Sequence, residues 1–224
     1  MVVQSALAAD VRLDAASALV TIVADEGSTT HPHVRSLYTL EGAEGSANAA
    51  DALHHLSMLH GRHPGVVDHA AARTASDSAR VALFAIGDNF LEERESLSRL
   101  VVAAGPIPST PGQAASEASV VHQRHAIEML ARSDRQGCAT GAALALAIDW
   151  HAIRPVMAAC ARRFGVDLRD SAIPDHDTLT GIARDACTNS AIERALLFGA
   201  RQIAAQHRAL WDLLEARAKA RQHY

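Results

Sequence analysis

The sequence predicts an all-α protein, a bundle of four to five long helices preceded by short N-terminal helices. Three observations predict this fold class. Alanine, leucine, glutamate and arginine, which are good helix formers, dominate the long segments. No segment shows the alternation of apolar and polar residues that a half-buried strand requires. Short connections rich in glycine and proline separate the long segments, as in a helical bundle.

Composition predicts one globular domain spanning residues 1–224. The chain has 224 residues, of which 49% are hydrophobic and 21% charged, with a net charge of −4. Only 4% of the residues are aromatic, so alanine, leucine and valine must fill the core. We expect an N-terminal helix and an irregular lead-in over residues 1–45, and the bundle itself over residues 46–224.

The N-terminal half is predicted to contain four helices. Ser46 is the expected N-cap of the second helix, and the segment 61–65, rich in glycine and proline, ends it. Gly105 and Pro106 end the fourth. The four expected helices cover residues 11–25, 46–60, 66–74 and 77–104.

Three further helices are expected in the C-terminal half. Thr110 and Gln113 have the spacing of a capping box at the start of the first, which runs to Ser133. Pro155 should kink or split the second. The three expected helices cover residues 111–133, 137–164 and 178–221.

The helix predicted at residues 137–164 should lie at the centre of the bundle. It is apolar on all sides as far as Ile148. Gly137 and Gly141, four residues apart, would let a neighbouring helix approach closely.

Ionisable residues on apolar helix faces are the main functional signal. A buried polar group costs free energy unless it is satisfied, so each of these residues needs a reason. Five long helices each contribute at least one, which predicts a polar constellation inside the bundle. The set is His60, Glu93, His122, His125, Asp149, Glu193 and His207.

Several of these residues also have a purely structural interpretation. His60 and His207 could each donate to a backbone carbonyl, and Glu93 could pair with an arginine across the bundle. Asp149 could cap a helix that restarts before Pro155.

Metal-free acid–base catalysis on a small-molecule substrate is the function that we expect first. His122 and His125 lie three residues apart on one predicted face and would be the base and its orienting partner. Glu93 or Glu193 would supply the acid. Asp149 and His60 would support them. A lyase reaction such as retro-aldol cleavage of a small apolar or aromatic substrate illustrates this chemistry.

A metal centre is the second alternative, and no other cofactor is favoured. Four long helices with acids and imidazoles in the core resemble the ferritin-like superfamily. That resemblance implies an oxidoreductase holding iron or manganese, with zinc a further choice of metal. The Glu-x-x-His motifs of that superfamily are missing, and His122-x-x-His125 is the nearest spacing. The ligands would be His122, His125, Glu93 and Glu193.

A non-catalytic helical binding or regulatory module is the third alternative. The net charge of −4 and the lack of a basic stripe argue against nucleic-acid binding. The longest uncharged apolar run, residues 137–148, is too short to span a membrane. The N-terminus lacks the basic region of a signal peptide, and three cysteines without a CxxC motif suit a reducing compartment, so we expect a cytoplasmic protein.

A second apolar stripe bears on oligomeric state. Phe84, Leu91 and Val102 lie on one face of the fourth predicted helix, away from its core stripe. Either a homodimer contact or the N-terminal helix would cover them.

Two short stretches resemble an uncharacterised bacterial all-helical family. They are Leu59–Gly65 and Ala104–Gln113. The resemblance implies no activity, but it draws attention to His60, Arg62 and His63 as a loop site at the mouth of the bundle. Alternatively, Gly61, Pro64 and Gly65 only end a helix and the histidines face solvent.

Overall fold

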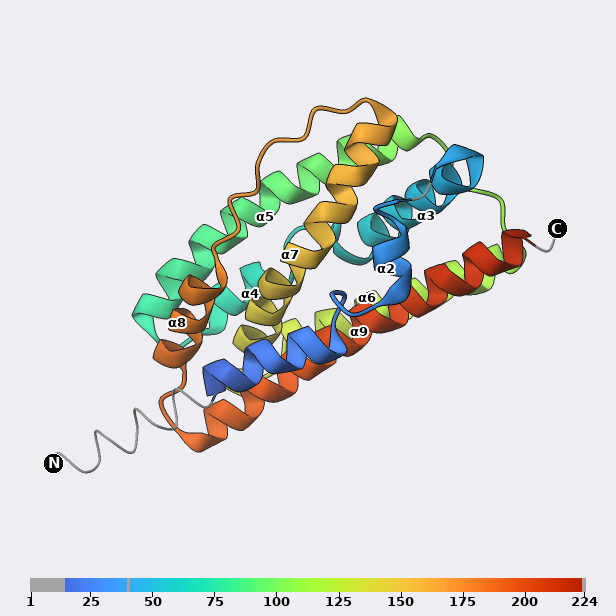
Figure 1. Ribbon diagram of the computed structural model, residues 1–224. Coiled ribbons are helices and arrows are strands. Elements are labelled where there is room, and N and C mark those ends of the chain that lie inside the picture. The colour runs from blue at the N-terminus through green and yellow to red at the C-terminus, as the bar shows by residue number, and fades with distance from the viewer. Residues whose placement is uncertain (1–14, 40, 223–224) are drawn as a thin grey trace, which may run out of the picture.

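The computed structural model describes residues 15–39 and 41–222, and it is all-α over this part of the chain (Figure 1). Within the described residues, the N-terminal helix covers residues 15–26, and there is no strand. The fold class predicted from the sequence is therefore confirmed. The later helices are α2 (Pro32–Ser36), α3 (Gly42–His60), α4 (Val66–Arg73), α5 (Asp77–Ala104), α6 (Gln113–Ala131), α7 (Cys138–Phe164), α8 (His176–Ala186) and α9 (Ser190–Gln222).

Two predicted helix starts were wrong. Helix α3 begins at Gly42 and not at Ser46, whose hydroxyl donates to the carbonyl of Gly42 inside the first turn. Thr110 does not cap α6, because the N-cap is Gly112 with a φ of 75°. The hydroxyl oxygen of Thr110 instead accepts hydrogen bonds from Arg217 at 3.2 Å and Arg221 at 2.9 Å.

The single long helix predicted at residues 178–221 is in fact two helices. Helix α8 ends at Ala186 and α9 begins at Ser190. The side-chain oxygen of Asn189 accepts from the backbone N–H groups of Ala191 and Ile192, both at 3.0 Å, and so caps α9. Pro155 was predicted to kink or split its helix, and the split was wrong, since α7 continues through this residue.

Helix α7 forms the centre of the bundle, as its composition predicts. It packs against every helix from α3 to α9, and every residue from Cys138 to Trp150 is buried. Over its full length α7 is long and apolar enough to cross a membrane, although its uncharged run is shorter. However, 67% of its most apolar 18-residue window is buried inside the protein, as in the core helix of a soluble protein.

Two glycines allow α7 and α9 to cross closely. A Cβ atom built on Gly141 of α7 would lie 1.9 Å from the backbone oxygen of Leu196 on α9. A Cβ atom on Gly199 of α9 would lie 2.1 Å from the backbone oxygen of Cys138. The predicted close approach at Gly141 is confirmed, and it sets the distance between the two helices that carry Asp149 and His207.

We expect Gly141→Ala to lower the free energy of unfolding by about 1–3 kcal/mol, because the new methyl group would collide with backbone and force the helices apart. Urea unfolding measures this loss. Gly181→Ala in α8 is the matched control, since a Cβ atom there meets nothing within 4 Å. That variant should gain about 0.5–1 kcal/mol from its higher helix propensity. Equal effects of the two substitutions would contradict the close-packing argument.

The outer face of α5 carries exposed apolar side chains. Phe84 is 53% exposed, Leu91 45% and Val102 81%. The described part of the N-terminal helix therefore does not cover this stripe. The homodimer contact suggested by the sequence stays a prediction.

Candidate functional site

Three ionisable side chains from three helices form a continuous chain of short contacts. Asp149 lies in the middle of α7, His207 in the middle of α9, and His60 is the last residue of α3. The Oδ2 atom of Asp149 lies 2.5 Å from Nδ1 of His207. The Nε2 atom of His207 lies 2.8 Å from Nε2 of His60. Asp149 is 1% exposed and His207 is fully buried.

A second set of donors surrounds the Asp149 carboxylate. Ser28 donates its backbone N–H to Oδ1 at 2.8 Å and its hydroxyl to Oδ2 at 2.5 Å. The hydroxyl oxygen of Ser28 in turn accepts the indole N–H of Trp211 at 2.7 Å. Because that oxygen already receives a proton, its own proton must point to Asp149. The carboxylate is thus held as an acceptor only, and the Nδ1 atom of His207 must carry a proton.

A glycine lets the chain after the N-terminal helix reach Asp149. A Cβ atom on Gly27 would lie 2.5 Å from Oδ1 of Asp149 and 2.4 Å from the backbone oxygen of Val23. Any larger residue would push the Ser28 backbone away from the carboxylate. The segment that sequence analysis treated as an irregular lead-in therefore supplies part of the site.

His60 is the outer end of the chain. It is partly buried, and its ring makes an edge contact with Trp150 at a centroid distance of 5.8 Å. Its Nδ1 atom makes no hydrogen bond to any described residue, and the His60 side chain is in part exposed to solvent. Burial, the neighbouring His207 and the charge of Arg94 hold the pKa of His60 well below its ordinary value. His60 is therefore a neutral base at neutral pH.

The geometry allows His60 to accept a proton while the resulting positive charge moves to His207. When Nδ1 of His60 takes a proton, the proton on its Nε2 atom can pass to Nε2 of His207. The resulting imidazolium charge lies beside the Asp149 carboxylate, which stabilises it. A neutral His60 with a lowered pKa can thus still accept a proton, because the charge does not stay on it.

A small cavity lies next to His60. Its volume is about 40 Å³, and it lies between α3, α4, α5, α6 and α7. Both His60 and Arg62, two residues of the loop site considered from the sequence, line it. The third residue of that expected loop site, His63, is different: its Nδ1 atom lies 3.4 Å from Asp68 and its side chain is 59% exposed.

Glu93 is buried, as predicted, but it is fully engaged. Its Oε2 atom accepts from Arg154 at 2.8 Å and from the indole N–H of Trp150 at 3.1 Å. Its Oε1 atom accepts from the Ser171 hydroxyl at 2.7 Å. The structural interpretation, an arginine partner across the bundle, is confirmed for Glu93. Trp150 connects this cluster to His60, since the same indole contacts both.

The remaining predicted site residues lie elsewhere. His122 and His125 are exposed on α6, so their expected place on a buried face was wrong. The α6 face that packs inward is instead the one with Ser116, Val120 and Ile127. The predicted burial of Glu193 was also wrong, because it is partly exposed in the first turn of α9.

Two structural alternatives for the central residues were wrong as well. Asp149 does not cap a restarting helix, because α7 is continuous around it. His207 does not donate to a backbone carbonyl, because its two ring nitrogens meet Asp149 and His60.

We expect His122→Leu combined with His125→Leu to change the free energy of unfolding by no more than about 0.5 kcal/mol, because exposed side chains contribute little to stability. Urea unfolding of the double variant tests this. A loss above 2 kcal/mol would restore these histidines to the core, where sequence analysis placed them.

The metal ligands expected from the sequence are not gathered. Within the described residues, the group of donor side chains with ligand atoms inside 4.8 Å of one another is His31, Asp212 and Glu215. The Nδ1 atom of His31 accepts the backbone N–H of His33 at 3.1 Å, so its Nε2 atom carries the proton and donates to Asp212 at 3.0 Å. A metal needs the lone pair on that nitrogen, so this tautomer does not fit a metal ligand.

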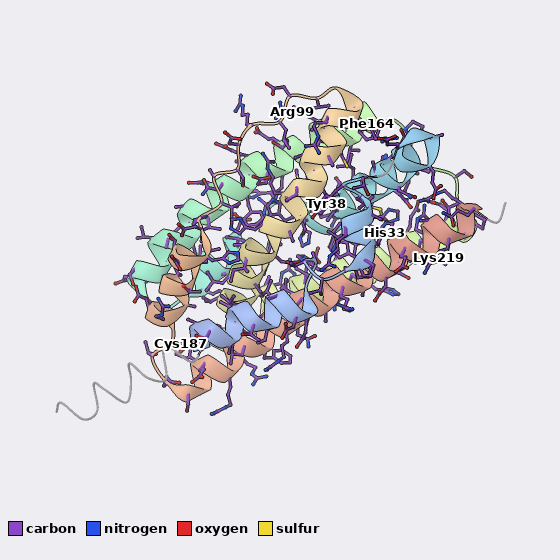
Figure 2. All side chains as sticks on the ribbon, in the orientation of Figure 1. His33, Tyr38, Arg99, Phe164, Cys187 and Lys219 are labelled. Atoms are coloured by element: carbon purple, nitrogen blue, oxygen red, sulfur yellow. The ribbon has the colours of Figure 1, made fainter. Side chains whose placement is uncertain are left out.

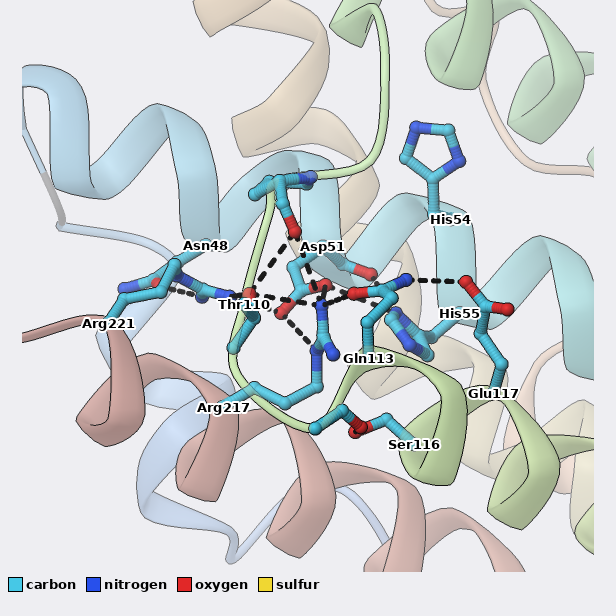
Figure 3. A network of polar contacts seen from close by, with 12 residues as sticks. Asn48, Asp51, His54, His55, Thr110, Gln113, Ser116, Glu117, Arg217 and Arg221 are labelled. Atoms are coloured by element: carbon cyan, nitrogen blue, oxygen red, sulfur yellow. Dashed lines mark hydrogen bonds and ion pairs between the residues drawn. The ribbon is translucent and has the colours of Figure 1, made fainter. Parts of the chain in front are cut away.

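A second buried polar network fastens the end of α9 to α3 (Figure 3). Asp51 is 1% exposed and accepts from the Arg217 guanidinium at 2.8–3.0 Å and from Arg221 at 2.7 Å. The Nη2 atom of Arg217, which donates to Asp51, also lies within hydrogen-bond distance of the side-chain oxygens of Gln113 and Thr110, at 2.8 and 3.2 Å. The network joins α3, the segment before α6 and α9, and we assign it a structural role.

His33, labelled on α2 in Figure 2, is buried beside this network. Burial, together with the nearby His31, lowers the pKa of His33 from 6.5 to about 4, while Glu215 and Asp51 oppose the shift. Between pH 6.5 and 4 the unfolded chain therefore binds a proton that the folded chain does not. The free energy of unfolding should fall by roughly 3 kcal/mol over this window as the pH is lowered.

Urea unfolding at pH 7 and pH 4.5 measures this effect. His33→Gln should show a smaller loss than the wild type, because glutamine does not titrate. The lowered pKa of His60 acts in the same direction and accounts for part of the remaining slope. An unchanged slope in the variant would rule out His33 as a source.

Two residues around Asp149, Ser28 and Trp211, were not predicted from the sequence. Ser28 gave no signal, because it falls in a segment without helical periodicity. Trp211 is apolar and was not among the ionisable residues considered, although it follows His207 by four residues and so lies on the same helix face.

The fold and the buried Asp149–His207–His60 chain define an all-helical bundle protein with a polar core. The polypeptide matches the model of a family of unknown function (DUF6975) over residues 23–222, and the protein belongs to that family. This agrees with the resemblance to an uncharacterised family, and no link to the ferritin-like superfamily is shown. No curated protein and no solved structure matches the chain.

Proposed function

We propose that the protein is an enzyme that catalyses proton transfer on a small molecule without a metal, with His60 as the catalytic base. The observation that carries this proposal is the chain Asp149–His207–His60, which begins on a buried carboxylate and ends on a partly exposed imidazole that lines a cavity. His207 and Asp149 are positioning residues. This revises the expectation from sequence, in which His122 and His125 formed the catalytic pair.

The arrangement differs from what a merely structural histidine needs. One hydrogen bond to a carbonyl satisfies a buried histidine, whereas here two imidazoles are joined through their Nε2 atoms. Such a pair must share one proton, and the shared proton is what allows charge to pass from His60 to His207. The donors around Asp149 fix the inner end, so only the outer end can exchange a proton with a substrate.

A lyase reaction suits a base of this kind. His60 would take the hydroxyl proton of a β-hydroxy ketone, the bond between the α and β carbons would break with its electron pair delocalised into the ketone carbonyl, and an aldehyde would leave. The carbanion that remains would take the same proton back from His60. The Asp149–His207–His60 chain, called the relay from here on, holds the proton between these two steps, and no net charge enters or leaves the site.

A panel of small β-hydroxy ketones, with and without a carboxylate group elsewhere in the molecule, tests the proposal. Aldehyde release and exchange of substrate C–H protons in D₂O are both followed by proton NMR. His60→Gln should lower the rate by about 10²–10⁴-fold, the usual contribution of a general base. His176→Gln is the matched control, because His176 is an exposed histidine on α8. It should keep the wild-type rate.

The positioning role of His207 needs a different readout. His207→Gln should lower the rate and also move the pH optimum, because His60 would lose the neighbour that accepts its charge. Histidine-ring ¹⁵N NMR of the resting protein should show His207 with a proton on Nδ1 and His60 neutral at pH 7. If His60 and His207 instead titrated independently of each other, that result would contradict the relay.

Two other functions lead to other outcomes. A non-catalytic bundle would use the same chain only to join α3, α7 and α9, and then neither turnover nor exchange should occur with any member of the panel. A metal-dependent oxidoreductase would acquire activity after incubation with iron or manganese. We propose a cytoplasmic location for this enzyme, which suits three cysteines without a CxxC motif.

A further inference from the structure

We infer that the cavity beside His60 binds a carboxylate group, so that the substrate is a small organic acid. This inference rests on the proposed function and adds the substrate class to it. The polar side chains that line the cavity carry an excess of positive charge. They are three arginines, two histidines and one acid: Arg62, Arg94, Arg124, His60, His69 and Glu128.

Pairing accounts for two of the three arginines. Arg94 lies 3.1 Å from Asp68 and also donates to the backbone oxygen of His60 at 3.3 Å. Arg124 lies 3.7 Å from Glu128. Arg62 has no hydrogen bond or ion pair to any residue of the described chain, and its side chain is exposed at the rim. The cavity therefore presents one uncompensated cation, next to the base.

The arginines have different roles in this arrangement. Arg94 is 8% exposed and packs so closely that a Cβ atom on Gly65 would lie 2.6 Å from it. It is held in place and forms part of the wall. Arg62 is the group free to meet an incoming anion, and a guanidinium matches the two oxygens of a carboxylate.

The size of the cavity selects among oxyanions. The cavity is small, about 40 Å³ against roughly 30 Å³ for one water molecule in the liquid, which suits a flat carboxylate better than a bulkier tetrahedral phosphate. Val66, Phe90 and Ile127 line the same cavity and would contact the apolar part of a short acid. A bound carboxylate would also favour the protonated relay, because it places a negative charge near His60.

Binding of sodium acetate, measured by histidine-ring ¹⁵N NMR at constant ionic strength in sodium chloride, tests the inference without any turnover. The His60 signals should shift and saturate, and Arg62→Gln should weaken binding about tenfold or more. Arg62 is exposed, so this variant keeps its fold. Arg201→Gln is the matched control, since Arg201 is an exposed arginine on α9, and it should bind acetate like the wild type.

Each outcome decides a different point. No saturable shift, or equal binding by Arg62→Gln and the wild type, would overturn the carboxylate site. Saturation by inorganic phosphate but not by acetate would overturn the choice of carboxylate. The relay is tested separately, by the proton on Nδ1 of His207 in the protein without acetate. If that proton is present and acetate does not bind, the proposed function stands and only the carboxylate inference is overturned.

Discussion

Replacing Asp149 by alanine should lower the free energy of unfolding by about 3–5 kcal/mol. The carboxylate accepts three hydrogen bonds, from the Ser28 backbone and hydroxyl and from His207. All of these groups are buried, so alanine would leave three donors without acceptors in the core. Urea unfolding at pH 7 measures the loss.

Asp149→Asn separates the loss of charge from the loss of an acceptor. The asparagine oxygen can still accept one or two of the bonds, so this variant should lose less, about 1–3 kcal/mol. Asp149→Asn also keeps the test possible if Asp149→Ala does not fold. Asp185→Ala, at an exposed position in α8, is the matched control and should change stability by no more than about 0.5 kcal/mol. A loss below 1 kcal/mol in Asp149→Ala would show that the chain is not held by this carboxylate.

The helices could be predicted from the sequence because helical patterning is local. The bounds of α5 and the end of α3 at His60 follow from the residues at their ends. The break between α8 and α9 was missed because the apolar stripe continues on both sides of it. Asn189 is the local signal that could have revealed it, since asparagine favours the N-cap position.

The candidate site was predicted only in part, for a different reason. A helical wheel ranks faces within one helix, and it placed Asp149 and His207 inward correctly, because α7 and α9 have dominant apolar stripes. On α6 the apolar residues surround the helix more evenly, with Val121 and Met129 exposed and Val120 buried, so the inward face cannot be read from that helix alone. Which of the inward residues meet depends on the crossing of helices far apart in the sequence.

Replacing Asp51 by alanine should also cost about 3–5 kcal/mol in free energy of unfolding. Its carboxylate faces Arg217, which is 3% exposed, and the fully buried His55. Burial alone would raise the pKa of Asp51, but hydrogen bonds from His55, Arg217 and Arg221 lower it well below its ordinary value of 3.8. Asp51 therefore stabilises the fold at neutral pH, and this contribution is lost as the pH falls below about 4.

Two comparisons test the origin of this effect. The difference in stability between Asp51→Ala and the wild type should shrink in acid, since protonation removes the same charge that the substitution removes. The double variant Asp51→Ala with Arg217→Met should lose less than the sum of the two single variants. Each single variant leaves a buried charge unpaired, whereas the double variant removes the pair together. Strict additivity would mean that Asp51 and Arg217 stabilise the protein independently, and the network of Figure 3 would then not act as one unit.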